Sequence, residues 1–247
     1  MKLLLMSDLH ANRQATEAVW AHACAQGFDR LALLGDYVDY GADPAWVVDF
    51  VQARKQEGAI VLQGNHDEAA AGDGNLGLAD HVIPSLDWTR RALSEEQRRW
   101  LGSLPLSAQV EQCLLVHANA IDPGHWSYIQ GRMEAIQSLH ATNCQYVVCG
   151  HMHEQALYHL TMTGKAGAFQ PTPGVTIALS AARRWLAIAG SVGQPRDGNP
   201  AAAYAMLDLE QGSITFHRVP YDHEAAACRI EAAGLPFVFA RRLRDGQ

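Results

Sequence analysis

Five apolar segments of this 247-residue chain end in side chains that can bind a metal ion. These side chains are Asp8 and His10, Asp36, Asn65 and His66, His117, and His151 and His153. They offer carboxylates, imidazoles and one amide but no thiolate, a mixture that suits divalent Mn, Fe, Co, Ni or Zn. Because one ion is satisfied by three or four protein ligands, this larger set predicts two ions with one aspartate bridging them.

Two divalent ions held about 3.5–4 Å apart are suited to hydrolysing a phosphate ester. They make hydroxide available near neutral pH and offset the negative charge that develops on the phosphoryl oxygens. The leaving alkoxide also needs a proton, which a histidine beside the ions can donate. His66 is the candidate for this role, and we expect its neighbour Asp67 to hold or polarise the ring. Asp39 is expected to support the site rather than to bind an ion.

The segments that carry these side chains are predicted to alternate between strands and helices. Strands are expected at residues 2–6, 31–34, 59–62, 113–116 and 146–149, and helices at 12–26, 43–57 and 132–141. Shorter runs after residue 175 predict antiparallel strands of a second sheet. Ligands of open α/β sheets bind at the carboxyl ends of parallel strands, so we expect the predicted metal ligands to meet there.

Residues 68 to about 105 differ from the rest of the chain. Residues 69–77 are rich in alanine and glycine and are expected to be mobile, whereas residues 85–99 have a helical pattern. We interpret this segment as a helical insertion that forms a cap over the loops. The full chain, 1–247, is expected to form a single domain with this insertion.

The order of five motifs resembles the calcineurin-like metallophosphoesterase superfamily. The motifs are Asp8-Leu-His10, Gly35-Asp36-Tyr-Val-Asp39, Gly64-Asn65-His66-Asp67, His117-Ala118 and Gly150-His151-Met-His153. Within the superfamily the chain most resembles the compact YfcE-like phosphodiesterases of bacteria and archaea, over nearly its whole length. This resemblance implies an α/β fold in which a two-sheet β-sandwich is flanked by helices on both outer faces.

The same resemblance implies a role for each residue of the site. One ion would be bound by Asp8, His10, Asp36 and His153. The other would be bound by Asp36, Asn65, His117 and His151, so that Asp36 bridges the two. His66 would be the general acid or a hydrogen-bond donor in the transition state, and Mn²⁺ is the favoured metal.

Two departures from the protein Ser/Thr phosphatase branch bear on the substrate. That branch places a phosphate-gripping arginine where this chain has Tyr40, and its Gly-Asn-His-Glu motif reads Gly-Asn-His-Asp here. Both differences favour a small phosphodiester over a phosphoprotein. A phosphomonoesterase or a dinucleoside-polyphosphate hydrolase on the same site stays open, as does a non-catalytic metal-binding scaffold. Asn12 and Arg196 are expected to contact the substrate.

The overall composition excludes several other classes of function. The net charge of −7 gives no basic surface for duplex nucleic acid, and no apolar run is long enough to span a membrane. The five cysteines form no Cys-x-x-Cys pair and their number is odd, which argues against a disulfide framework. We therefore expect a cytoplasmic protein, and the sequence does not indicate its oligomeric state.

Overall fold

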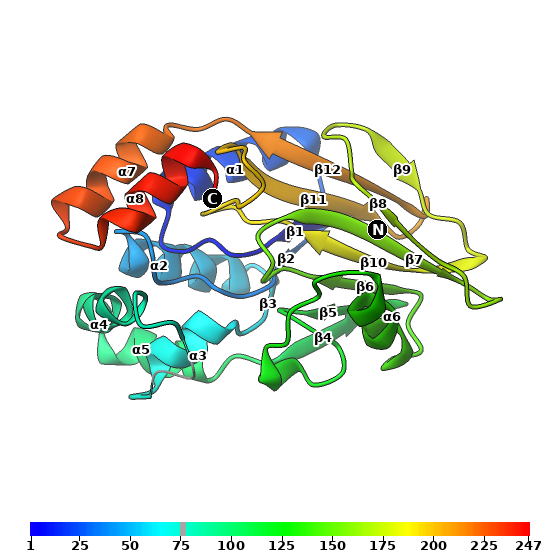
Figure 1. Cartoon of the computed structure of the whole chain (residues 1–247), viewed down its shortest axis with the longest axis horizontal. Helices are drawn as coiled ribbons and strands as arrows, with labels where there is room; N and C mark the ends of the chain where they lie inside the picture. Colours follow the sequence, from blue (N-terminus) through cyan, green and yellow to red (C-terminus); the bar gives the residue numbers. More distant parts are fainter. Residues whose placement is uncertain (75–77) are drawn as a thin grey trace.

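Two six-stranded sheets pack face to face in the computed structural model, which describes residues 1–74 and 78–247 (Figure 1). The first sheet has the order β3 (Ile60–Val61), β2 (Arg30–Leu33), β1 (Lys2–Met6), β11 (Ala202–Asp208), β12 (Ser213–Val219) and β9 (Thr176–Ala178). The second has the order β4 (Ser107–Val110), β5 (Cys113–Val116), β6 (Tyr146–Cys149), β10 (Arg183–Ala189), β7 (Gln155–Thr161) and β8 (Ala166–Phe169). The expected two-sheet α/β sandwich is confirmed.

The position of strand β1, buried on both faces, explains why its sequence is almost entirely apolar. Leu3 and Leu5 point into the core between the two sheets, whereas Leu4 and Met6 pack in the core beneath the outer helices. A strand buried on both faces needs apolar residues at every position. Strands β1, β2 and β3 are parallel, and β5, β6 and β10 are parallel in the second sheet. Their carboxyl ends therefore lead into the loops that carry the predicted ligands.

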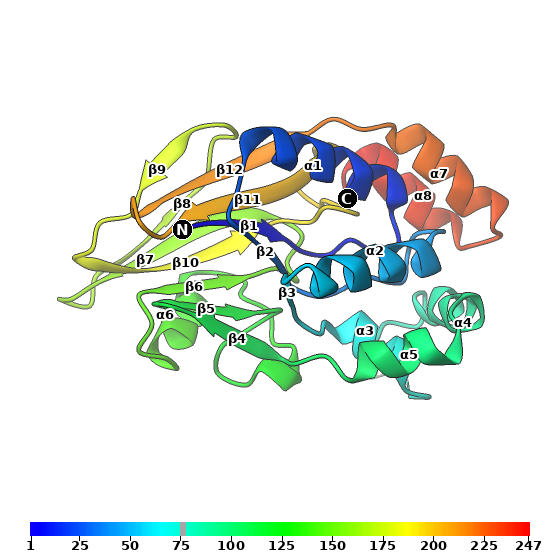
Figure 2. The ribbon, with the colours of Figure 1, turned by 180° about the vertical axis from the view of Figure 1, so that it is seen from behind.

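Helices cover both outer faces of the sandwich (Figure 2). Helices α1 (Arg13–Gln26) and α2 (Pro44–Gln56) share a core with the first sheet, and α6 (Arg132–His140) packs on the second. Helices α7 (His223–Ala232) and α8 (Phe237–Asp245) pack against each other near the C-terminus. No helix within residues 1–74 and 78–247 combines the length and apolar character required to cross a membrane.

The strands expected after residue 175 do not form a second sheet of their own, although β9, β12 and β11 pair with one another in the antiparallel manner expected. Strands β9, β11 and β12 join the first sheet beside β1, and β10 pairs in parallel with β6. Strands β4, β7 and β8 were not expected at all. The period of apolar residues identifies a strand but not its partner, because pairing is decided by contacts distant in the sequence.

The described part of the segment expected to be a helical insertion contains three helices, and the first of them begins within the third motif. Helix α3 (Asn65–Ala71) is followed by α4 (Ile83–Ala92) and α5 (Glu95–Gly102), and α3 packs against both. Residues 69–71 belong to α3, whereas residues 75–77 of the segment expected to be mobile lie outside the described residues. A short 3-10 helix, η1 (Pro123–His125), lies between β5 and α6.

Candidate metal centre

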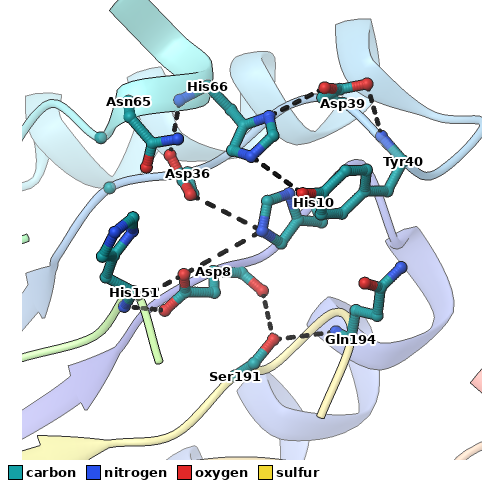
Figure 3. Close-up of polar contacts among 12 residues, drawn as sticks. Asp8, His10, Asp36, Asp39, Tyr40, Asn65, His66, His151, Ser191 and Gln194 are labelled. Carbon is teal, nitrogen blue, oxygen red and sulfur yellow. Dashed lines mark hydrogen bonds and ion pairs between the residues drawn. The ribbon is translucent and has the colours of Figure 1, made fainter. Parts of the chain in front are cut away.

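The seven predicted metal ligands meet in one buried cluster at the carboxyl ends of β1, β2, β3, β5 and β6. Figure 3 labels five of them: Asp8, His10, Asp36, Asn65 and His151. The most exposed of the seven is Asn65, at 8%. Ligand atoms of Asp8, His10, Asp36 and His153 lie within 4.8 Å of one another, and so do those of Asp36, His117 and His151. Asp36 belongs to both groups, as a bridging ligand must.

The first group is oriented by backbone carbonyls on its outer side. Nδ1 of His10 lies 3.1 Å from the Val38 carbonyl oxygen, and Nδ1 of His153 lies 2.6 Å from that of Gln194. Both Nε2 atoms therefore face inward, 3.1 Å from each other. Metal-binding histidines commonly donate their other ring nitrogen in this way, which fixes the tautomer.

The second group has the same construction. Nδ1 of His117 lies 2.8 Å from the Leu34 carbonyl oxygen, so that its Nε2 faces Asp36 Oδ2 at 3.3 Å. The same Nε2 lies 3.2 Å from Asn65 Oδ1 and 3.2 Å from His151 Nδ1. Nitrogen and oxygen atoms of four residues thus converge on one point, with Asn65 supplying the neutral oxygen.

The protonation states of His10, His151 and Asp36 suit metal binding, whereas that of His117 opposes it. Burial lowers the pKa of His10 well below its usual value, and burial with the charge of His117 lowers that of His151 to about 3. Burial would raise the pKa of Asp36, but His117 and His66 hold it well below the usual range. Burial also opposes charge on His117, but Asp36 raises its pKa to about 9. A metal ion at His117 must therefore displace a proton, which makes its affinity depend on pH.

The backbone at the ligands is strained. Asp8, His10, Asp36, His151 and His153 have φ between 44° and 66°, the left-handed region that non-glycine residues rarely adopt. Such conformations cost of order 1–3 kcal/mol each and concentrate at functional sites. The sharp turns after β1, β2 and β6 thereby aim successive side chains at the same centre.

Two motif glycines are required by the close approach of neighbouring loops. A Cβ atom at Gly64 would collide with the side chain and backbone of Asp36, and one at Gly150 would collide with Ser7 and Asp8. Any larger residue would push the loops apart. Glycine at these positions therefore lets the loop of the third motif approach Asp36 and the loop of the fifth motif approach Asp8.

His66 lies beside the cluster, but its partner differs from the one predicted. Its Nδ1 lies 2.8 Å from Asp39 Oδ2 and its Nε2 lies 3.0 Å from the Tyr40 hydroxyl (Figure 3). Ser85 of α4 also contacts Asp39, so the insertion supports this arrangement. The expectation that Asp67 holds the ring is wrong, because adjacent residues of α3 point in different directions around the helix.

Asp67 instead joins the loops of the second and third motifs. Its Oδ2 accepts hydrogen bonds from the backbone N–H groups of Asp36 and Gly64, at 2.8 and 2.9 Å, and its Oδ1 accepts one from Tyr37 at 2.9 Å. Burial raises its pKa to about 7, with repulsion from Asp36 adding to the effect. The side chain is fully buried and fixes the backbone of the bridging residue.

Tyr40 connects the site to Arg196. Its ring stacks on His10 with centroids 4.3 Å apart, and its hydroxyl accepts a hydrogen bond from Arg196 Nη2 at 3.4 Å. In the sequence analysis Tyr40 was noted only as the residue that replaces an arginine, and its contact with the metal ligands was missed. The one sequence feature that could have indicated this contact is its position directly after Asp39. Arg196 is partly exposed, and its expected contact with the substrate stays a prediction.

Asn12 has a structural role, and its expected contact with the substrate stays a prediction. Its Oδ1 accepts the Ala15 N–H at the start of α1, and its Nδ2 donates to the Gly193 carbonyl at 2.8 Å and to the Tyr221 hydroxyl at 3.0 Å. The side chain is 3% exposed, so both ends of its amide are engaged inside the protein. Residues that cap a helix commonly use their side chain in this way.

Comparison with known proteins agrees with this geometry. Residues 1–212 match the sequence model described as the calcineurin-like phosphoesterase superfamily domain, and the chain belongs to this superfamily. A crystal structure of a metallophosphoesterase from Sphaerobacter thermophilus is similar over 100% of both chains, with 32% identity and a TM-score of 0.86.

Two further relatives cover almost the full length of the chain. A hypothetical protein from Pyrococcus horikoshii OT3 has the same fold, with 18% identity, a TM-score of 0.80 and coverage of 100% of this chain and 98% of that one. An uncharacterized protein from Methanocaldococcus jannaschii is 28% identical over 250 residues, which are 99% of this chain and 98% of the relative. The fold is therefore shared over its whole length.

Proposed function

We propose that this chain is a phosphodiesterase that uses two divalent transition-metal ions, with Mn²⁺ favoured. The observation that carries the proposal is the pair of overlapping ligand groups that share Asp36. Membership of the phosphoesterase superfamily supports it. The ions would be held by the two groups, with Asn65 completing the second, and when bound they supply an activated hydroxide and positive charge near the phosphoryl oxygens.

His66 is proposed to donate the proton that the leaving oxygen needs. Burial opposes charge on the ring, but Asp36 and Asp39 outweigh burial and raise the pKa of His66. The protonated form, which a general acid requires, is thereby favoured. Asp39 is placed at Nδ1, so the Nε2 edge stays turned toward Tyr40 and the centre.

Arg196 is proposed to contact an anionic group of the substrate beside the scissile phosphate. Tyr40 fills the place of the phosphate-gripping arginine of the protein phosphatases, and Arg196 from another loop reaches the Tyr40 hydroxyl. A diester carries one negative charge fewer than a fully ionised monoester and needs less cationic contact at the scissile group. This favours a small phosphodiester as the substrate over a phosphomonoester, and a dinucleoside polyphosphate is the other alternative.

The test compares turnover of bis(4-nitrophenyl) phosphate, 4-nitrophenyl phosphate and a dinucleoside polyphosphate by the Mn²⁺-loaded protein. We expect kcat/KM to be highest for the diester, and preference for either other substrate would replace the diesterase assignment. His66→Ala should lose turnover but keep its bound metal, whereas His140→Ala, an exposed histidine on α6, should match the parent. A parent that binds two ions but hydrolyses none of the three would be a metal-binding scaffold.

A cytoplasmic location is part of the proposal. All five cysteines are free, and Cys113, Cys144 and Cys149 are buried. Unpaired thiols are the usual state in a reducing compartment. Trapping free thiols in freshly lysed cells tests this, because a disulfide among them would contradict the proposed location.

A further inference from the structure

We propose that Arg196 and Arg242 form a second anion subsite beside the metal centre, which binds an additional anionic group of the substrate such as a terminal phosphate. The inference rests on the proposed function, because it assigns a place to a second group of the same substrate. The newly assigned residue is Arg242 of α8, which belongs to none of the five sequence motifs of the site.

The two arginines come together on a pair of stacked rings. Tyr40 stacks on Phe239 of α8 with ring centroids 4.7 Å apart and an interplanar angle of 24°. The guanidinium of Arg196 lies 5.8 Å from the Tyr40 ring, and that of Arg242 lies 5.8 Å from the Phe239 ring. Two cations from separate parts of the chain are therefore held near each other by a rigid aromatic support.

The subsite lies next to the proposed catalytic groups. The hydroxyl of Tyr40 contacts Arg196 Nη2 at 3.4 Å and His66 Nε2 at 3.0 Å, so one side chain separates the arginine from the proposed proton donor. The same ring stacks on the ligand His10. A substrate whose scissile phosphate lies over the metal centre could therefore reach Arg196 with its next charged group.

Neither arginine is neutralised within the described part of the chain. Arg241 and Arg244 of the same helix form ion pairs with Asp245 and with Glu224 and Glu231, but Arg196 and Arg242 pair with no carboxylate of residues 1–74 and 78–247. Both are only partly exposed, and Arg196 Nε is buried with no hydrogen-bond partner there.

The proximity of the two guanidiniums has an electrostatic cost. Burial lowers the pKa of Arg242, and the charge of Arg196 lowers it further. Two like charges near a low-dielectric interior are unfavourable unless an anion binds between them. Guanidinium groups bind phosphate and carboxylate with two parallel hydrogen bonds, so this pair suits an oxyanion.

A charge count indicates that the anion is a second group rather than the scissile one. Two divalent ions would bring four positive charges, of which Asp8, Asp36 and one hydroxide would cancel three. The remaining charge is matched by the single negative charge of a phosphodiester. Arg196 and Arg242 therefore provide two further positive charges, close to the charge of about −1.5 to −2 on a terminal phosphate at pH 7.

The experiment uses two diesters that share a leaving group. They are thymidine 5′-(4-nitrophenyl phosphate) and the same compound with a 3′-phosphate, assayed with the Mn²⁺-loaded full chain. We expect the parent to prefer the 3′-phosphorylated diester roughly tenfold or more in kcat/KM, mainly through KM, because a charge-assisted hydrogen bond has about that effect. A 3′-carboxymethyl analogue shows whether a carboxylate serves as well as a phosphate.

The variants separate the subsite from general charge effects. Arg242→Gln should reduce the preference to near unity, Arg242→Lys should keep part of it, and Arg241→Gln should keep all of it. Arg241 is the matched control, because it removes one positive charge from the adjacent, exposed position of the same helix. No preference in the parent, or equal preference in the parent and Arg242→Gln, would overturn the inference.

A binding measurement keeps the inference distinct from the proposed function. Pyrophosphate binding to the metal-free protein, measured by calorimetry, should weaken at least fivefold in Arg242→Gln and stay unchanged in Arg241→Gln. If the parent hydrolyses neither diester, the proposed function fails, yet this difference in binding would still support the subsite. Equal pyrophosphate binding by the parent and Arg242→Gln would overturn the subsite even if both diesters are hydrolysed.

Discussion

Replacing Asp67 by alanine tests whether this residue fixes the loops of the metal centre or assists His66. The carboxylate accepts three buried backbone N–H groups, from Asp36, Tyr37 and Gly64. A buried donor left without a partner costs about 1–3 kcal/mol. Because water can enter the vacated space, we take the lower end, about 3 kcal/mol for the three donors. In a chain of this size, such a loss lowers the Tm by about 6–12 °C.

The assay is thermal unfolding of the metal-free protein, so that bound ions do not mask the change. Metal content is then measured after loading with Mn²⁺, and we expect Asp67→Ala to bind less because the backbone of Asp36 has lost its support. Asp87→Ala is the control, because Asp87 is a half-exposed aspartate on α4 whose loss should change stability by no more than about 0.5 kcal/mol.

The opposite outcome would refute this account of Asp67. A variant with an unchanged Tm and full metal content, but with reduced turnover, would show that Asp67 acts on His66. In that case the 2.8 Å contact between His66 and Asp39 would not describe the working site.

Four further predictions follow from the site. Asp36→Asn should lose both ions and turnover together, as measured by elemental analysis and bis(4-nitrophenyl) phosphate hydrolysis; normal metal content would exclude bridging. Chelation should abolish turnover and Mn²⁺ should restore it, so full activity after verified metal removal would contradict the mechanism. Asp39 raises the pKa of His66, and activity requires the protonated ring, so activity is lost as pH rises through that pKa. Asp39→Asn should therefore move the alkaline limb of the kcat/KM profile to lower pH, and an unmoved limb would show that another group sets it. Tyr40→Phe should lower kcat/KM roughly tenfold or more, since the hydrogen bonds of the hydroxyl with His66 and Arg196 are lost while the ring remains; an unchanged value would show that the hydroxyl is dispensable.

The strands that carry the ligands, and the grouping of those ligands, could be predicted because both depend on short segments, whereas the two-sheet sandwich was implied by the resemblance to the superfamily. Strand β1 is an apolar run that ends just before Asp8 and His10, and β2 and β6 are likewise followed by ligands. Strand ends that carry polar groups meet at one edge of a parallel sheet, so the sequence alone groups the ligands.

The partner of His66 could not be predicted from its neighbours in the sequence. Asp67 lies directly next to His66 in the sequence, which suggested a contact between them. Helix α3 begins at Asn65, however, and successive helical residues point about 100° apart. The true partner, Asp39, is separated from His66 by 27 positions, a contact that no local pattern encodes.

Two other features depend on long-range contacts in the same way. Strand β10 pairs in parallel with β6, whereas its sequence shows only that it is an apolar strand. Arg242 reaches the neighbourhood of Tyr40 because α8 packs against the loop after Asp39, through the stacked ring of Phe239. Nothing in the sequence around Arg242 distinguishes it from the other arginines of that helix.

Anomalous X-ray diffraction from crystals grown with Mn²⁺ is the most direct test of the central claim. We predict two peaks about 3.5–4 Å apart, one near His10 and His153 and the other near His117 and His151, with Asp36 between them. A single peak, or peaks that Asp36 does not contact, would contradict the two-metal account.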